Sequence, residues 1–190
     1  MTDRQLRIEV VIGSVREGRI GPRVAEWVVD RIERYSAAER DGFDHGLIDL
    51  AEMRLPADLA PSTETEAFRS RVASADAFVV VTPEYNHGYP AALKTAFDSL
   101  KYEWRGKPIG FVSYGGPAGG VRAVEQLRQV VAELHMVSVR QSVGFQRARR
   151  QLDAATIDEM VEDSMQRMLG QLAWWARATR THGATTAYPG

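Results

Sequence analysis

The sequence predicts an α/β fold: a doubly wound, five-stranded parallel sheet with helices on both faces. Short apolar runs alternate five times with segments whose apolar residues recur every three or four positions, which indicates repeated strand–helix units. The run at residues 77–82 is apolar at every position but the last, as expected for a strand buried on both faces. Because connections are short and no repeat is found, the 190 residues suit one domain at 1–180, followed by a small, polar tail at 181–190.

The first half of the chain is expected to supply two strands and two helices. Residues 6–12 form a clear apolar strand, and a weaker one covers residues 43–50. A helix follows Pro22, a residue that suits the first helical turn. A second helix is expected at 63–75, after an irregular loop at 55–62 that contains two prolines. The face of the first helix consists of Val24, Trp27, Val28, Ile32 and Tyr35.

The second half adds three strands, at residues 77–82, 109–113 and 136–139. Three helices alternate with them and close the predicted sheet on both faces. Their apolar faces consist of Leu93, Ala96, Phe97 and Leu100; of Val121, Val124, Leu127, Val131 and Leu134; and of Ile157, Met160, Val161, Met165, Met168, Leu172 and Trp175.

The composition excludes several classes of function. Lys and Arg number 24 against 25 Asp and Glu, so a broad surface for nucleic acid or anionic membrane is not expected. The chain has no cysteine, which excludes disulfides, thiol nucleophiles and thiolate metal sites. Its four histidines lie far apart, and no metal site is expected. No stretch has the length and apolarity of a membrane helix or a signal peptide, so we expect a cytoplasmic protein.

Three unusual loops follow predicted strands one, three and four. In an open α/β sheet these loops lie at the carboxyl edge, where ligands bind. The first loop, residues 13–21, holds three glycines, a hydroxyl and two arginines ahead of a helix. Free N–H groups, the helix dipole and Arg16 would all favour a phosphate. The alternative is a glycine-rich turn with solvated arginines.

Two known phosphate motifs are nearly matched in this loop. Gly13 and Gly18 have the spacing of a P-loop, but Arg19 and Ile20 replace the Lys and Ser/Thr that must follow. The dinucleotide fingerprint G-x-G-x-x-G is absent as well. A monophosphate therefore fits better than a triphosphate or a bound pyrophosphate.

The second loop suits a flat ring, and the third allows a ligand to approach the backbone. Residues 82–90 combine two tyrosines, a carboxylate, an amide and an imidazole between prolines, a set that can contact both the face and the polar edge of a heterocycle. A proline-bounded turn with incidental polar residues is the alternative. Residues 113–120 hold four glycines, which let the backbone approach a ligand closely. A flexible loop that binds no ligand is the alternative. A nucleophile elbow is excluded because Gly110 lies three residues before Ser113 rather than two.

These loops resemble those of the NADPH-dependent FMN reductases, a flavodoxin-like family that includes quinone, azo-dye and chromate reductases. The order and spacing agree over residues 7–139. Two departures concern the first loop, where many relatives carry Ser in place of Arg19 and often Asn in place of Gly21. The matching segments are Gly13-Ser14-x-Arg16, Pro83-Glu84-Tyr85-Asn86-His87-Gly88-Tyr89-Pro90-Ala91-x-Leu93-Lys94-x-x-x-Asp98 and Ser113-Tyr114-Gly115-Gly116.

The resemblance implies non-covalent FMN and an NADPH or NADH donor. Hydride would pass from the donor to the N5 atom of FMN and then, by ping-pong kinetics, to flavin, quinone or another small acceptor. The cofactor supplies this chemistry, so no side chain is expected to act as an essential acid or base. For the phosphate, the resemblance implies Ser14 and Arg16, with the backbone near Ile20 and Gly21. For the ring, it implies Pro83, Glu84, Tyr85 and Asn86 on one side and Ser113, Gly115 and Gly116 on the other.

Two other functions remain open from sequence. A flavodoxin-type electron carrier would usually present a strongly acidic face, which a net charge of −1 argues against. A scaffold that has lost its cofactor would not bind FMN. The resemblance also implies a homodimer or homotetramer, and we expect Trp104 or Trp174 to be covered on assembly, because tryptophan is enriched at subunit interfaces.

Overall fold

The computed structural model describes residues 4–39, 42–154 and 157–190. Its centre is a parallel sheet in the order β2-β1-β3-β4-β5, in which β6 also pairs with β4. This order confirms the predicted doubly wound fold. All strands are parallel, and the order in which the chain adds them reverses between β1 and β3. The strands are β1 (Leu6–Ile12), β2 (Phe43–Asp49), β3 (Ala77–Pro83), β4 (Pro108–Gly115), β5 (Val137–Ser138) and β6 (Val143–Gln146).

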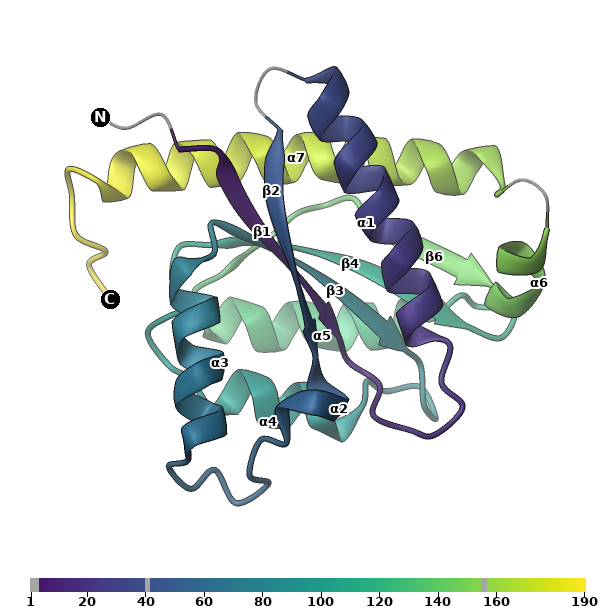
Figure 1. Cartoon of the computed structure of the whole chain (residues 1–190), viewed down its shortest axis with the longest axis horizontal. Helices are drawn as coiled ribbons and strands as arrows, with labels where there is room; N and C mark the ends of the chain where they lie inside the picture. The colour runs from purple at the N-terminus through teal and green to yellow at the C-terminus, as the bar shows by residue number, and fades with distance from the viewer. Residues whose placement is uncertain (1–3, 40–41, 155–156) are drawn as a thin grey trace.

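Helices cover both faces of this sheet (Figure 1). One face carries α1 (Gly21–Ala38) and α7 (Glu159–Gly183), and the other carries α3 (Thr63–Ser74), α4 (Ala91–Asp98) and α5 (Val121–Glu133). Two separate apolar cores result, because the alternating side chains of each strand point to opposite faces. All seven residues of β3 are buried, as its unbroken apolar run predicted.

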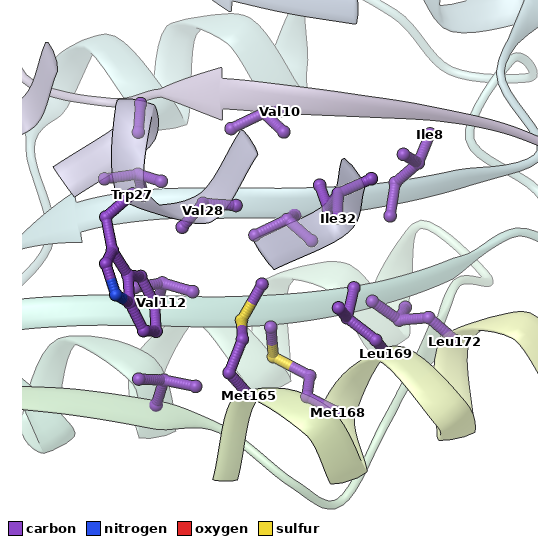
Figure 2. Close-up of a cluster of buried hydrophobic side chains, with 14 of the residues drawn as sticks. Ile8, Val10, Trp27, Val28, Ile32, Val112, Met165, Met168, Leu169 and Leu172 are labelled. Atoms are coloured by element: carbon purple, nitrogen blue, oxygen red, sulfur yellow. The ribbon is translucent and has the colours of Figure 1, made fainter. Parts of the chain in front are cut away.

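The first core is closed by α7, which lies directly on the sheet. Figure 2 shows Met165 and Met168 of this helix extending over β4, beside Val112, toward α1. Gly110 of β4 allows this approach, since a Cβ there would lie 2.8 Å from the Met168 sulfur. The glycine thus serves helix–sheet packing.

The fifth strand differs from the prediction. Only Val137 and Ser138 pair as β5, and β6 pairs with β4 further along. The second segment is short and contains Gly144, so it carries no readable apolar pattern. Two short helices, α2 (Leu50–Met53) and α6 (Ala148–Asp153), also lack an apolar period of their own.

The end of the chain is also more ordered than expected. Helix α7 continues to Gly183, three residues into the predicted tail. Beyond it, the Tyr188 hydroxyl lies 3.0 Å from Nδ1 of His135, and the carbonyl of Gly190 accepts a hydrogen bond from Arg105.

Trp104 is a core residue rather than a surface one. It is 2% exposed and packs against three phenylalanines from α3, β3 and α4, namely Phe68, Phe78 and Phe97. The expectation that assembly covers Trp104 was therefore wrong, because the fold of one chain already covers it. Trp174 is 62% exposed. None of the described helices combines the length and apolarity needed to cross a membrane.

Candidate functional site

The loops after β1, β3 and β4 lie together at the carboxyl edge of the sheet. Backbone bonds extend the strand pairing into them: Gly13 N–H donates to Val81 O (2.9 Å) and Glu84 N–H to Tyr114 O (3.1 Å). A cavity of about 660 Å³ opens here, within the usual size range of small-molecule sites. Its lining residues are Ile20, Pro83, Glu84, Tyr85, Tyr114, Gly115, Arg147, Ala148, Arg149 and Arg150.

The β1–α1 loop has unused hydrogen-bond donors. Within the described ranges, no backbone N–H of residues 14–20 donates to a protein acceptor. These groups precede α1, whose dipole favours an anion at this end. The Arg16 side chain is exposed, and its guanidinium lies 5.3 Å from the centre of the Tyr85 ring. The loop is thus suited to a phosphate group.

Ser14 and Arg19 help to hold this loop in shape. The Ser14 hydroxyl is fully buried and lies 2.7 Å from the hydroxyl of Tyr85. Arg19 donates to both carboxylate oxygens of Asp49, at 2.5 and 2.7 Å, and to the carbonyl of Ser14 at 2.6 Å. The bonds to Asp49 raise the pKa of Arg19. Sequence reasoning missed this pair because Asp49 is 30 residues away.

The structure gives a steric reason for glycine at position 21, which the sequence did not show. A Cβ at this position would lie 2.9 Å from a methyl carbon of Ile12 and 3.0 Å from the hydroxyl of Tyr114. The Tyr114 hydroxyl therefore occupies part of the space that a side chain at position 21 would need. The Tyr114 hydroxyl is buried and has no hydrogen-bond partner among the described residues. Burial raises its pKa, so it remains protonated and able to donate.

The β3–α4 loop contains a two-residue hairpin turn. Tyr85 and Gly88 exchange backbone hydrogen bonds of 2.8 and 2.9 Å, and the residues between them, Asn86 and His87, have φ of 48° and 70°. Two successive positive φ angles are typical of a type I′ turn, which Asn favours at its first central position. Because Tyr85 N–H is used inside the turn, the two N–H groups at its tip, those of Asn86 and His87, are left without a protein acceptor in the described chain.

Glu84 anchors the hairpin to α5. Its carboxylate accepts from the backbone N–H of Arg122 at 3.1 Å and from the side chain of Arg122 at 2.8 Å. Burial disfavours the charged form, but these bonds and the Arg122 charge outweigh it and lower the pKa of Glu84. Glu84 is therefore an ionised structural anchor at the edge of the cavity.

The β4–α5 loop is folded tightly by its glycines. Ser113 is buried and donates to the carbonyl of Gly119 at 2.8 Å, so its hydroxyl holds the loop. A Cβ at Gly115 would lie 3.2 Å from the nitrogen of Gly120, and Gly115 lines the cavity. Gly116 is exposed with open space around it. Direct contact of Ser113 and Gly116 with a cofactor remains a prediction.

Helix α6 and the residue before it add three arginines that sequence reasoning did not assign. Arg147, Arg149 and Arg150 all line the cavity and are exposed. The backbone N–H of Arg147 donates to the carbonyls of Gly115 and Gly116, at 3.1 and 3.3 Å. The Arg149 side chain donates to the carbonyl of Gly18 at 3.1 Å. The helix thus connects the loops after β1 and β4.

This arrangement fits FMN. The unused N–H groups of residues 14–20, together with Arg16, suit one phosphate. The buried Tyr114 hydroxyl is a donor without a partner in the described protein and lies beside the first residue of α1. The cavity wall formed by Pro83, Tyr85 and Gly115 offers apolar contact for a ring.

Comparison with known proteins identifies the family. The sequence model for NADPH-dependent FMN reductases matches residues 6–150. The chain belongs to this family. An NAD(P)H-dependent FMN reductase of Schizosaccharomyces pombe is 41% identical over 141 residues, which cover 68% of each chain. A 2-hydroxy-1,4-benzoquinone reductase of a Burkholderia species is 28% identical over 92% of this chain and 98% of its own.

A solved structure agrees on the fold. The flavoenzyme NAD(P)H:(acceptor) oxidoreductase FerB of Paracoccus denitrificans superposes with a TM-score of 0.71 at 21% identity, covering 92% of this chain and 98% of its own. The resemblance stated from sequence and the flavodoxin-like fold are therefore confirmed. Because the family and its relatives are reductases, the protein is an oxidoreductase. This supports the enzyme over the alternative of a non-enzymatic electron carrier.

Proposed function

We propose that this FMN reductase oxidises NAD(P)H and reduces a small quinone or flavin at the cavity between the three loops. The observation that carries this proposal is the β1–α1 loop, where residues 14–20 keep unused N–H donors beside Arg16 and the cavity. Such a loop suits a tightly held monophosphate. The 2-hydroxy-1,4-benzoquinone reductase among the relatives supports a quinone as acceptor.

Different residues around the cavity would bind the phosphate and the ring of FMN. Arg16 and the N–H groups through Ile20 and Gly21 would bind the phosphate, with the Tyr114 hydroxyl as a further donor. Ser14 would fix Tyr85 through their shared hydrogen bond. On the ring side, contact would come from Pro83, Glu84, Tyr85, Asn86, Gly115 and Gly116, with Ser113 holding the last loop in place.

FMN, when bound, supplies hydride transfer between the donor and the acceptor. The protein's part is to position it and to favour negative charge at its polar edge. The N–H groups of Asn86 and His87 point out of a rigid turn without a protein acceptor in the described chain, so they can stabilise such charge without reorganising. No side chain is needed to deliver a proton, and Glu84 is unsuited to that role because it is ionised and bonded to Arg122.

Cofactor binding tests this proposal directly. FMN and riboflavin are titrated into wild-type protein and Arg16→Ala, and binding is followed by quenching of flavin fluorescence. A guanidinium–phosphate bond is worth about 1.5–3 kcal/mol, so FMN should bind about one to two decades more weakly to the variant. Riboflavin, which lacks the phosphate, should bind both proteins alike. If wild type and Arg16→Ala bound FMN with equal affinity, Arg16 would not be a phosphate ligand.

Activity is tested on the protein loaded with FMN. Anaerobic addition of NADPH should bleach the flavin absorbance without any partner protein, and a benzoquinone should restore it. A chain that needs a partner protein for bleaching would instead be an electron carrier.

We also propose a homodimer that acts in the cytoplasm. The adjacent Trp174 and Trp175 leave a large aromatic surface exposed on α7, and such surface is enriched at subunit interfaces. Sedimentation at micromolar concentration should give twice the chain mass. A fully active monomer would contradict this assembly.

A further inference from the structure

The cavity presents more positive charge than the phosphate of FMN requires. Three arginines line it, Arg147 at the N-cap of α6 and Arg149 and Arg150 in its first turn, and a fourth, Arg16, lies over the ring of Tyr85 in the cavity wall. Within the described ranges, neither Arg147 nor Arg150 has a side-chain hydrogen bond or an ion pair, and Arg149 bonds only a carbonyl. The chain as a whole has balanced charge, so this group of uncompensated arginines is a local feature.

The position of α6 is fixed relative to the rest of the site. At its start, Arg147 N–H is bonded to the carbonyls of Gly115 and Gly116, and further along Arg149 is bonded to Gly18. Helix α6 also follows directly after β6, which pairs with the cavity end of β4. The free side chains of Arg147 and Arg150 are therefore held at the rim of the cavity by backbone contacts that do not involve them.

We propose that Arg147 and Arg150 bind the phosphate groups of the nicotinamide dinucleotide that donates hydride. This inference rests on the proposed function, since the donor must enter the same cavity as FMN. A dinucleotide brings a pyrophosphate, and NADPH brings in addition a 2′-phosphate of about −1.5 to −2 charge. Arginine is the side chain that best matches such groups, because its planar fork can donate two hydrogen bonds to one phosphate.

The phosphate of FMN is already provided for by the β1–α1 loop. The N–H groups of residues 14–20 and Arg16 suit that single phosphate, whereas Arg147 and Arg150 come from a separate segment, at the start of α6, that also lines the cavity. A ligand that arrives from solvent after FMN is bound would meet these two side chains. The assignment thus gives the two anions to two different segments of the chain.

The test uses the full chain loaded with FMN and two fragments of the donor. Adenosine 2′,5′-bisphosphate carries the 2′-phosphate, and ADP-ribose carries the pyrophosphate without it. Their affinities are measured by calorimetry for wild type, Arg147→Gln, Arg150→Gln and the double variant. Arg167→Gln is the matched control, because Arg167 is an exposed arginine that lines a different cavity.

The double variant should bind at least one of the two fragments about tenfold or more weakly, with the control unchanged and FMN retained in full. The fragment that loses affinity identifies which phosphate the arginines contact. In steady-state assays the matching effect is a raised KM for the dinucleotide at unchanged kcat.

Unchanged affinity for both fragments would overturn the inference. So would loss of FMN from the double variant, since the arginines would then belong to the FMN phosphate. A wild-type chain that fails to retain FMN would contradict the proposed function itself, and this result is distinct because it is seen before any arginine is changed.

Discussion

The hydroxyls of Ser14 and Tyr85 lie 2.7 Å apart and join the loop after β1 to the loop after β3. This one bond connects the part of the site that suits a phosphate with the part that suits a ring. Tyr85 also lies under the guanidinium of Arg16, so its aromatic ring has contacts that its hydroxyl does not share.

Replacing Tyr85 separates these two roles. Tyr85→Phe keeps the ring and loses a hydrogen bond worth about 1 kcal/mol, so the FMN dissociation constant should change by no more than about fivefold. Tyr85→Ala also removes the cavity wall and should weaken binding about ten- to hundredfold. Fluorescence titration measures both, with Tyr102→Ala as a control at an exposed tyrosine elsewhere. If the two Tyr85 variants lost the same FMN affinity, the ring of Tyr85 would not contribute to binding.

The pair of Arg19 and Asp49 should stabilise the folded chain. Both side chains are largely buried, and three charge-assisted hydrogen bonds depend on Arg19. A double-mutant cycle with Arg19→Ser and Asp49→Asn should give a coupling energy of about 1–3 kcal/mol in urea unfolding. The corresponding cycle for Arg167 and Asp163, an exposed pair at 3.5 Å, should give almost none. Similar values for both cycles would show that Arg19 is not a structural residue.

Gly21→Ala should destabilise the protein although alanine favours helices. The new methyl group would come within 3.0 Å of Ile12 and Tyr114, and overpacking of this kind costs about 1–3 kcal/mol. Adding Tyr114→Phe removes one of the two close contacts and should restore part of the loss. Gly170→Ala is the matched control: it lies inside α7 with open space around it, so it should stabilise by about 0.5–1 kcal/mol. Thermal unfolding distinguishes these outcomes, and a neutral Gly21→Ala would contradict the packing argument.

Lys107 should make stability depend on pH in the alkaline range. Its amine donates to the carbonyls of Val72 and Ala73 at the end of α3. Burial lowers the pKa of Lys107 from 10.5 to about 8, although Asp76 and Glu103 oppose this change. Between these two values the unfolded chain binds more protons than the folded one, so stability rises with pH across this window.

Comparison with Lys107→Met isolates this effect. The free energy of unfolding of wild type, relative to the variant, should increase from pH 8 to pH 10.5 by at most about 3 kcal/mol. Lys101→Met changes an exposed lysine and should show no such trend. A difference between wild type and Lys107→Met that does not change with pH would mean that the amine is not desolvated.

The elements that the sequence predicts well are those with a strong local pattern. Residues 77–82 are buried on both faces as β3, and the stripe that includes Trp27 and Ile32 faces the core. Non-local relationships could not be read in the same way. Trp104 is buried by phenylalanines that lie far from it in sequence, and β6 is a strand because β4 pairs with it.

The site shows the same division. Its three loops are recognisable from their glycines and polar residues, since each follows a strand of the parallel sheet. The arginines of α6 have no such signal, because a run of charge usually marks a solvated surface. Only the pairing of β6 beside β4 brings Arg147 to the cavity. The partner of Arg19 likewise depends on β2 lying next to β1.

The close packing of Met168 on Gly110 has a consequence for oxidative damage. An FMN reductase passes electrons to small oxidising acceptors, and in a chain without cysteine methionine sulfur is the main target of oxidation. Met165 and Met168 are sealed between α7 and the sheet, where an added sulfoxide oxygen has no room. Met160, at the start of the same helix, is 77% exposed. Peroxide should therefore convert Met160 before Met165 and Met168, at a position where the polar sulfoxide disturbs no core contact.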